Sequence, residues 1–531
     1  MSTLDWWRTG AIYQVYIRSF ADGNGDGTGD VAGLRAKLPY LADLGIDGIW
    51  INPWYPSPLL DGGYDVADYR DIHPDFGTLA DAEAMIAEAN ELGIKVLVDL
   101  VPNHCSWDHE WFKAALAAEP GSPERDRFHF VDNGDEPPSN WRSVFGGPAW
   151  SRTDDGQWYL HLFDSSQPDL NWENPEVRAE FLSILRFWLD RGANGFRVDV
   201  AHGITKDTSW PDVEAAQILS NTKQPNHAHW DRDDVHEIIR EWRAVLDEYD
   251  DRMMVAEAWV AAESLAKYLR PDEYHQSFSF GLLSASWNAA DYQDAIREVY
   301  DEAHALGAAS TWVLSNHDVM RHATRFGLPD DAEWRTWPVT GPADLLDAER
   351  GARRARAAAL ITLGLPGSAY VYQGEELGLD EVWDLPWEVL DDPVARRSEG
   401  TQKGRDGCRV PIPWNADGPS YGFGANGSWL PQPDWFADVA ADQQIGVAGS
   451  FHSLYRDALH VRREHLIDDA VMTWLDLGND LLAFERGNGV RCVVNMGATS
   501  VPMPDGEILL TSTPGLTDEL PSDTGVWLRP C

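Results

Sequence analysis

Short apolar stretches alternate with longer stretches of helical periodicity through most of this chain. Residues 195–200 show the strand pattern clearly, because Phe196, Val198 and Val200 alternate with polar positions. Six further strands of this kind are predicted at 11–17, 45–51, 95–101, 253–259, 310–318 and 368–376. Helices are predicted near 31–44, 79–92, 175–191 and 233–249, with others between the later strands.

A weaker strand near 277–283 brings the number of strand–helix units to eight. Alternation of this kind indicates a parallel sheet, and eight units indicate that the sheet closes on itself. The predicted fold is therefore an α/β fold, a (β/α)8 TIM barrel. In such barrels, the residues that perform chemistry lie at the C-terminal ends of the strands.

Two regions depart from this alternation. Residues 104–172 are rich in Trp, Pro, Gly and Asp, which predicts an irregular domain inserted after the third strand. Beyond about residue 464, short alternating pieces and turns predict a C-terminal antiparallel β domain. The predicted organisation is a barrel formed by 1–103 and 173–463, an inserted domain at 104–172, and a C-terminal domain at 464–531.

Composition excludes some classes of partner. The 531 residues include 87 acidic and 42 basic side chains, giving a formal net charge of −45. Nucleic acids and anionic membranes both require a positive face, so neither is an expected partner. The longest apolar run, around 357–372, contains Gly364, Pro366 and Gly367, and we do not expect it to span a membrane.

The compartment is predicted from the N-terminus and the cysteines. The first ten residues have neither a basic segment nor an apolar segment, so we expect no signal peptide. The four cysteines, at 105, 408, 492 and 531, lack the spacing of metal ligands and suggest free thiols in a reducing cytoplasm. The oligomeric state is left open between a monomer and a homodimer.

Carboxylates close four of the predicted strands. Asp99, Asp199, Glu257 and Asp318 each lie at a strand end, and Arg197 lies two residues before Asp199 on the same face. A guanidinium beside a carboxylate keeps that carboxylate ionised and oriented, which a carboxylate nucleophile needs. Residues 195–202 alone could equally contain a structural ion pair, but a cluster of four carboxylates at one end of a barrel favours catalysis.

Two carboxyl groups, one ionised and one protonated, are the catalytic groups that glycoside hydrolysis typically uses. Asp199, with its arginine, is suited to be the nucleophile. Glu257 lies in an apolar strand with no cation next to it in the sequence, so we expect desolvation to favour its protonated form, as a general acid requires. The G-x-S-x-G elbow, the Walker loop and the H-E-x-x-H zinc motif do not occur in the sequence.

At this point the chain resembles glycoside hydrolase family 13, the α-amylase family, over essentially its full length. DLVPNH, GFRVDVAH, EAW and SNHD resemble the four signatures of the family in their order and spacing. QPDLNW resembles the extra signature of the α-glucosidase and oligo-1,6-glucosidase branch. These motifs lie at 99–104, 195–202, 257–259, 315–318 and 167–172.

The resemblance implies a role for each matching residue. Asp199 would be the nucleophile, Glu257 the acid/base, and Asp318 the carboxylate that holds sugar hydroxyls. The residues implied to bind the sugar are Asp61, Tyr64, His104, Phe163, Arg197, His317 and Arg409, with Arg405 as a neighbour of Arg409. The alternatives are a core tyrosine at 64, a structural hydrogen bond at 104 and a surface ion pair at 409. Cys408 and Val410 depart from the R-D-N-x-R-T pattern of the branch, which weakens the assignment of Arg409.

A glycine-rich loop at 22–30 suggests a metal site. Its opening, D-x-N-x-D-G, copies the first half of an EF-hand loop, although position twelve is Gly33 and no helix precedes the loop. Hard oxygen ligands suit Ca²⁺, and the resemblance implies structural Ca²⁺ here, with the main-chain oxygen of Thr28 as a further ligand. The candidate ligands are Asp22, Asn24, Asp26, Thr28 and Asp30. The alternative is an Asx-turn loop without an ion.

The resemblance further implies a retaining exo-acting α-glucosidase that releases glucose from the non-reducing end of short α-1,4-linked substrates such as maltose. Val200 resembles the residue found in α-1,6-preferring members, so an oligo-1,6-glucosidase is the alternative. A sucrose- or trehalose-converting isomerase would share every motif, and transglycosylation is open to any retaining enzyme. A non-catalytic relative is disfavoured, because the carboxylates are present. Residues 202–234 are expected to roof the +1 subsite.

Overall fold

The computed structural model describes residues 5–214, 225–466 and 471–530. Eight parallel strands form its central sheet, in the order β10-β11-β1-β2-β3-β7-β8-β9. The Thr311 hydroxyl, from edge strand β10, donates to the Ser277 carbonyl of edge strand β9 over 2.6 Å and draws the two edges together into a barrel. The strands are β1 (Ala11–Val15), β2 (Gly48–Ile51), β3 (Lys95–Leu100), β7 (Gly195–Val198), β8 (Met253–Ala256), β9 (Gln276–Ser277), β10 (Thr311–Val313) and β11 (Ser368–Tyr372).

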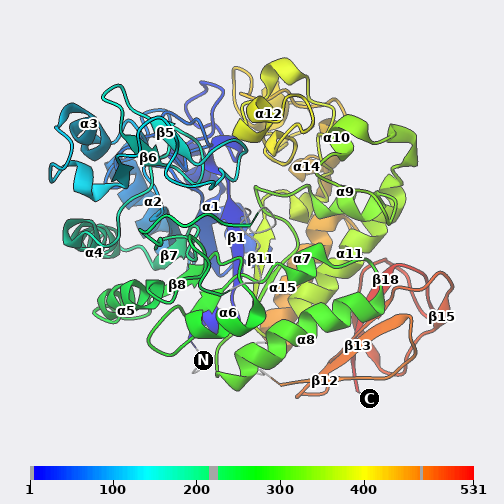
Figure 1. Cartoon of the computed structure of the whole chain (residues 1–531). Helices are drawn as coiled ribbons and strands as arrows, with labels where there is room; N and C mark the ends of the chain where they lie inside the picture. Colours follow the sequence, from blue (N-terminus) through cyan, green and yellow to red (C-terminus); the bar gives the residue numbers. More distant parts are fainter. Residues whose placement is uncertain (1–4, 215–224, 467–470, 531) are drawn as a thin grey trace.

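Helices alternate with these strands and lie around the sheet (Figure 1). The major ones are α1 (Val31–Leu44), α2 (Leu79–Glu91), α4 (Pro175–Asp190), α5 (Val235–Leu246), α6 (Ala262–Tyr268), α8 (Ala289–Ala305), α11 (Ala348–Gly364) and α15 (Phe451–His465). Local sequence fixes their ends. Asp30 caps α1 by accepting from the Gly33 N–H, and Gly45 ends it in the left-handed region with φ 98°. Thr78 and Asp81 form a capping box at the start of α2.

The shorter helices of the barrel segments lie mostly after β9. They are α7 (Gly281–Ser284), α9 (His322–Gly327), α10 (Trp337–Thr340), α12 (Pro393–Arg397), α13 (Phe436–Val439) and α14 (Ala441–Gln444). The strand predicted at 277–283 is therefore mostly wrong. Only Gln276–Ser277 pair with β8, and Leu282 and Leu283 are buried from helix α7 instead. A short apolar run is equally compatible with a strand and a buried helical turn, so the hydrophobic pattern could not separate the two.

The chain between β3 and α4 forms a small unit of its own, within the region predicted as an inserted domain. It contains α3 (Glu110–Ala117) and a three-stranded antiparallel sheet of β4 (Phe130–Val131), β6 (Trp158–Leu160) and β5 (Trp150–Arg152). Buried tryptophans, Trp141 and Trp150 among them, pack here against Trp230, which follows the barrel strand β7. This packing joins the inserted unit to the mouth of the barrel.

The C-terminal part is an antiparallel sheet, as predicted. Its order is β12-β13-β14-β18-β16, and β15 and β17 form a separate pair. The Trp527 indole N–H donates to the Leu360 carbonyl of α11 over 3.0 Å and ties this sheet to the barrel. The strands are β12 (Met472–Trp474), β13 (Leu481–Arg486), β14 (Arg491–Asn495), β15 (Val501–Pro502), β16 (Glu507–Thr511), β17 (Glu519–Leu520) and β18 (Thr524–Arg529).

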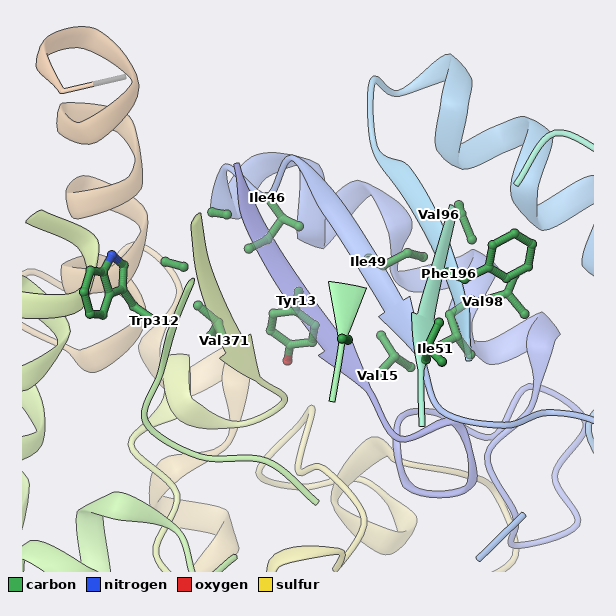
Figure 2. Packing of buried hydrophobic residues seen from close by; sticks show 14 of the residues in the cluster. Tyr13, Val15, Ile46, Ile49, Ile51, Val96, Val98, Phe196, Trp312 and Val371 are labelled. Atoms are coloured by element: carbon green, nitrogen blue, oxygen red, sulfur yellow. The ribbon is translucent and has the colours of Figure 1, made fainter. Parts of the chain in front are cut away.

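One large core cluster fills the space between the strands and the helices around them. Figure 2 shows Ile49 and Ile51 of β2 beside Val96 and Val98 of β3 in this cluster. All four side chains are fully or almost fully buried.

The described part of the chain contains no helix with the length and apolar character needed to cross a bilayer.

Arg462 of α15 hydrogen-bonds to main-chain groups near the N-terminal ends of strands β1 and β11. It is 3% exposed, and its guanidinium donates to the carbonyls of Thr9, Leu363, Leu365 and Gly367. Burial lowers its pKa to about 9. This one side chain therefore satisfies main-chain groups from two segments, the residues before β1 and the turn from α11 into β11.

We expect Arg462→Leu to lower the free energy of unfolding by at least about 3 kcal/mol, because buried carbonyls lose their partner. Equilibrium unfolding in urea measures this change. Arg456→Leu on the same helix is the control, since within the described residues Arg456 pairs only with Asp457, and it is partly exposed. Its effect should stay within about 1 kcal/mol. Equal effects of the two changes would contradict the structural role of Arg462.

Candidate active site

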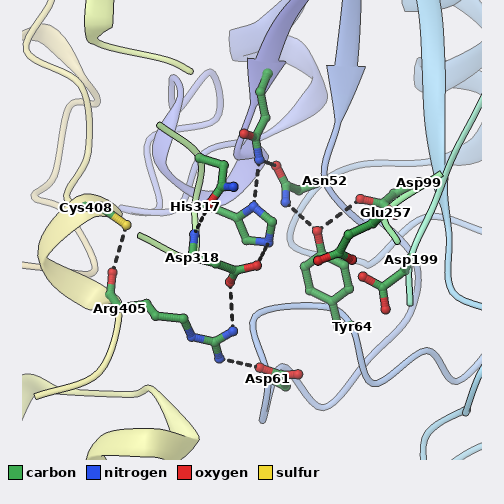
Figure 3. A network of polar contacts seen from close by, with 12 residues as sticks. Asn52, Asp61, Tyr64, Asp99, Asp199, Glu257, His317, Asp318, Arg405 and Cys408 are labelled. Atoms are coloured by element: carbon green, nitrogen blue, oxygen red, sulfur yellow. Dashed lines mark hydrogen bonds and ion pairs between the residues drawn. The ribbon is translucent and has the colours of Figure 1, made fainter. Parts of the chain in front are cut away.

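The predicted catalytic carboxylates gather at the C-terminal end of the barrel (Figure 3). Asp99 lies in β3, Asp199 follows the last residue of β7, and Glu257 follows the last residue of β8. Asp318 lies five residues beyond the end of β10. The strands are thus shorter than predicted: Asp199 and Glu257 are the first residues after their strands, and Asp318 lies further along its loop.

Arg197 binds three carboxylates at once. Its guanidinium is 2% exposed, and Nη1 donates to Asp199 Oδ1 over 2.6 Å and to Asp99 Oδ1 over 3.0 Å. Nη2 donates to Glu257 Oε2 over 2.6 Å. The pairing of Arg197 with Asp199 was predicted, but the expectation that Glu257 has no cation beside it is wrong. The prediction considered only sequence neighbours, whereas Arg197 reaches Glu257 from the adjacent parallel strand.

The protonation of this cluster follows from its charge. Burial raises the pKa of Asp199, Arg197 opposes this, and the Glu257 and Asp99 carboxylates raise it further. Burial also raises the pKa of Asp99 to about 6, against the influence of Arg197. Burial thus disfavours the ionised forms of Asp199 and Asp99, and Arg197 opposes this effect at both carboxyl groups.

Asp318 lies in a different electrostatic setting. Its Oδ1 accepts from Arg405 Nη1 over 2.8 Å and from Arg409 Nη2 over 3.1 Å, and its Oδ2 lies 3.3 Å from His317 Nε2. Burial would raise the pKa of Asp318, but the contacts with His317, Arg405 and Arg409 hold it below its usual value. Because burial keeps His317 itself neutral, the two guanidinium groups account for the ionised Asp318.

Arg405 is the residue that sequence reasoning undervalued. Besides Asp318, it donates from Nη2 to Asp61 Oδ1 over 2.7 Å and from Nε to Asp392 Oδ2 over 2.5 Å. Arg409 is not a surface ion pair, since it is 3% exposed and donates from Nε to the His317 carbonyl. It is Arg405, however, that joins Asp61 to Asp318. Asp392, which fixes this arginine, carried no sequence signal.

The remaining predicted sugar-binding residues converge on the same place. The Tyr64 ring stacks on His317 with centroids 5.2 Å apart, and its hydroxyl donates to Asp99 Oδ2 over 3.0 Å. Tyr64 is thus buried, as the core alternative required, but it faces the polar cluster. The His104 ring lies 4.9 Å from the Phe163 ring, and its Nε2 lies 3.2 Å from the Tyr64 carbonyl oxygen.

A buried ion pair fixes the segment after the nucleophile. Lys206 Nζ lies 3.1 Å from Asp169 Oδ2, within the QPDLNW motif, and donates to Asn103 Oδ1 over 2.7 Å. Neither partner of the ion pair is exposed. The QPDLNW motif therefore acts here through a contact to the nucleophile loop. Residues 215–224 of the predicted +1 roof lie outside the described residues.

Val200 has a strained backbone. Its φ is 44°, the left-handed region that a β-branched residue rarely adopts. This conformation directs the Val200 N–H to Glu257 Oε2 over 3.2 Å, and the Trp259 indole N–H donates to Glu257 Oε1 over 3.0 Å. The loop backbone thus orients the predicted acid/base.

The predicted calcium loop lies apart from this cluster, before α1. Asp30 is occupied as the helix cap, since its carboxylate accepts from the N–H groups of Gly23, Asn24 and Gly33. Among the described residues, no three His, Cys, Asp or Glu side chains form a metal-binding group. Asp22, Asn24 and Asp26 likewise accept hydrogen bonds from N–H groups of the loop. Together with Asp30 and the Thr28 carbonyl, they form a set of hard oxygens whose chemistry fits Ca²⁺.

Comparison with known proteins places this geometry in a family. Residues 14–470 match the alpha-amylase catalytic domain family. A probable alpha-glucosidase from Rhizobium meliloti is 36% identical, with 93% of this chain and 89% of the relative covered. An oligo-1,6-glucosidase from Parageobacillus thermoglucosidasius is 34% identical, with 87% and 84% covered. A solved α-glucosyl transfer enzyme, XgtA, superposes with a TM-score of 0.85 at 32% identity, covering 99% of this chain and 100% of that one.

The family match spans most of the chain, and the relatives extend it to nearly the full length. The family resemblance inferred from the motifs is therefore confirmed. This chain belongs to the α-amylase family of glycoside hydrolases.

Proposed function

We propose that this glycoside hydrolase is a retaining, exo-acting α-glucosidase that releases glucose from the non-reducing end of short α-1,4-linked oligosaccharides such as maltose. The observation that carries the proposal is the contact of one guanidinium, Arg197, with both Asp199 and Glu257. It holds the two carboxyl groups side by side at the end of the barrel, as a double displacement requires.

In the first step, Asp199 attacks the anomeric carbon as the glycosidic C–O bond breaks, and Glu257 gives its proton to the departing oxygen. In the second step, Glu257 takes a proton from water, whose oxygen displaces Asp199 from the glucosyl ester. Asp318, kept ionised by Arg405 and Arg409, accepts hydrogen bonds from sugar hydroxyls. Two displacements at the same carbon retain the α configuration.

Exo action is supported by the bridge through Arg405. Its guanidinium joins Asp61 to Asp318, so charged groups gather on this side of the cluster (Figure 3). A glucose at this position would have its far hydroxyls bound by Asp61 and Arg405, which leaves no room for a further sugar. The pocket would therefore accept only a terminal glucose.

One alternative remains for the linkage and two remain for the reaction. The relatives include an oligo-1,6-glucosidase, and Val200 agrees with α-1,6 preference. A sucrose- or trehalose-converting isomerase would use the same residues. Transglycosylation requires only that a sugar hydroxyl replace water in the second step, and XgtA is named as a transfer enzyme.

We also propose that the loop at 22–30 binds structural Ca²⁺ through Asp22, Asn24, Asp26, Asp30 and the Thr28 carbonyl. The set of hard oxygens in one loop supports this, and Asp30 also caps α1. A cytoplasmic location is supported by three buried free thiols, Cys105, Cys408 and Cys492, while Cys531 lies outside the described residues. Monomer and homodimer both stay open.

We expect Asp199→Ala to lower glucose release by at least about four orders of magnitude, because the nucleophile is lost. Azide should restore turnover of 4-nitrophenyl α-glucoside and yield the β-glucosyl azide, since the anion attacks from the vacated face. Chromatography and NMR of the products measure both effects. Asp154→Asn, at an exposed position in the inserted unit, should leave turnover unchanged. Full activity of Asp199→Ala would refute the mechanism.

Linkage preference is tested on maltose and isomaltose at equal concentrations. We expect a higher kcat/KM for glucose release from maltose, measured by a coupled glucose assay. A higher value for isomaltose would establish the α-1,6 alternative. Conversion of sucrose into an isomeric disaccharide, without net glucose release, would establish the isomerase.

We expect added Ca²⁺ to raise the Tm of the protein stripped with a chelator, since an ion at 100 times its Kd stabilises by about 2.7 kcal/mol. Asp26→Ala should abolish the Ca²⁺-induced rise in Tm, whereas Asp154→Ala should keep it. Differential scanning fluorimetry reads out the shift rather than the absolute Tm, so a general destabilisation by the substitution does not confuse the result. No rise in the wild-type protein would leave the loop as an ion-free Asx-turn loop.

A further inference from the structure

A cavity of about 430 Å³ adjoins the catalytic cluster. It lies among the residues of α7, the start of α8, α9 and α11 (Figure 1). Its size falls within the usual range for small-molecule sites, about 300–1,000 Å³. The lining includes four aromatic side chains, Trp259, Trp287, Phe326 and Trp334, and three basic ones, Arg325, Arg335 and Arg354.

The cavity wall is directly connected to the proposed acid/base. Trp259 lines the cavity and donates its indole N–H to Glu257 Oε1 over 3.0 Å. Val319, which follows Asp318 in the chain, also lines the cavity. Since Glu257 must protonate the leaving oxygen, the leaving group lies on the Glu257 side of the bond that breaks. A leaving group bound there would lie against Trp259.

The charge of the lining is unexpected for a protein with a net charge of −45. Asp330 is the one acidic side chain that lines the cavity in the described residues, against three arginines. Arg354 pairs with Asp523 over 3.1 Å, and Arg335 lies 3.6 Å from a Glu333 oxygen. The charges of these two arginines are thus balanced within the protein.

Arg325 differs from the other two arginines. Its guanidinium donates to the carbonyls of Leu314, over 2.9 Å, and Met320, over 3.3 Å. Within the described residues, no carboxylate oxygen lies within the 4.0 Å of an ion pair with it. These two contacts use two of its five N–H groups. Burial lowers its pKa to about 10, against the influence of Tyr292, Glu375 and Glu381, which lie beyond ion-pair distance.

We propose that this cavity binds the leaving group of α-glucosides whose aglycone carries a carboxylate, with Arg325 as its partner. The inference rests on the proposed α-glucosidase function and adds a class of substrate to it. A guanidinium binds a carboxylate with two parallel hydrogen bonds. Because Arg325 has no ion-pair partner among the described residues, its single positive charge matches a monoanion better than a phosphate dianion. The apolar faces of the aglycone would pack on Trp259 and Trp334. Repulsion from the acidic surface is screened beyond about 8 Å at physiological salt.

The reaction itself is unchanged. The glycosidic C–O bond breaks, Glu257 protonates the leaving oxygen, and water then releases glucose from Asp199. The carboxylate of the aglycone takes no part in these steps. Arg325 is therefore a specificity residue that selects among substrates through their leaving groups.

Two open-chain relatives of maltose provide the test. Maltitol and maltobionate each carry an α-1,4-linked glucose, but the aglycone is neutral glucitol in the first and anionic gluconate in the second. We expect wild-type kcat/KM to be at least about 10-fold higher for maltobionate, since a hydrogen-bonded ion pair contributes about 1.5–3 kcal/mol. Arg325→Gln should lower the maltobionate-to-maltitol ratio of kcat/KM at least about 10-fold, and Arg325→Lys should retain most of it.

Both substrates are assayed with the same protein sample. A smaller folded fraction therefore lowers both kcat/KM values equally and leaves their ratio unchanged. Arg353→Gln on α11 is the matched control, because this exposed arginine does not line the cavity and should leave the ratio unchanged. Equal kcat/KM for the two substrates in the wild type, or the same drop in ratio with Arg353→Gln, would overturn the proposal. Failure to release glucose from maltose, maltitol and maltobionate alike would instead overturn the α-glucosidase function.

Discussion

The active site depends on one buried guanidinium that must serve carboxyl groups from three adjacent strands. The register of the sheet makes this arrangement possible. Arg197 on β7 lies directly opposite Asp99 on β3 and Val255 on β8. Parallel pairing therefore brings Asp99 beside Arg197, and the residue two beyond Val255 is Glu257. A shift of one residue in either pairing would point these side chains away from the barrel axis.

The carboxyl groups of the site face two different sets of arginines, Arg197 on one side and Arg405 with Arg409 on the other. Within the described residues, Arg197 is the basic side chain that pairs with Asp99, Asp199 and Glu257, and burial raises the pKa of Asp199 there. Arg405 and Arg409 together face Asp318, whose pKa is held low. The same end of the barrel thus contains a carboxyl group whose pKa is raised, Asp199, and one whose pKa is lowered, Asp318. The proposed acid/base and sugar-binding roles follow from this division of charge more directly than from the identity of any single residue.

Much of the fold was predictable, because strand and helix periodicity depends on local sequence. The barrel, the inserted unit and the C-terminal sheet follow from where that periodicity continues and stops. The failures are also physical. A two-residue strand such as β9 has too few positions to show alternation, and the buried residues after it belong to a helix. The absence of a cation beside Glu257 was inferred from sequence neighbours, whereas the cation lies on the adjacent strand.

The roles of Arg405 and Asp392 were hidden for a related reason. Both lie after β11, in a stretch dominated by loops and short helices, so no period relates them to the strand ends. Their position is fixed by charge: Asp392 holds Nε of Arg405, which leaves both terminal nitrogens for Asp61 and Asp318. The spacing of Asp392 and Arg405 in the sequence does not indicate that the two side chains pair.

Val200 shows why the linkage preference resists inference from residue identity. The left-handed backbone of a β-branched residue costs about 1–3 kcal/mol, and the surrounding structure must compensate for this cost. Here it is the strained N–H that contacts Glu257, while the side chain packs near Trp230 in the cluster of the inserted unit. A smaller residue at this position would change both the shape of the site and the strain on the loop that orients the acid/base. Selectivity between linkages and the strength of the general acid are therefore coupled at Val200, and one cannot be assigned to its side chain without the other.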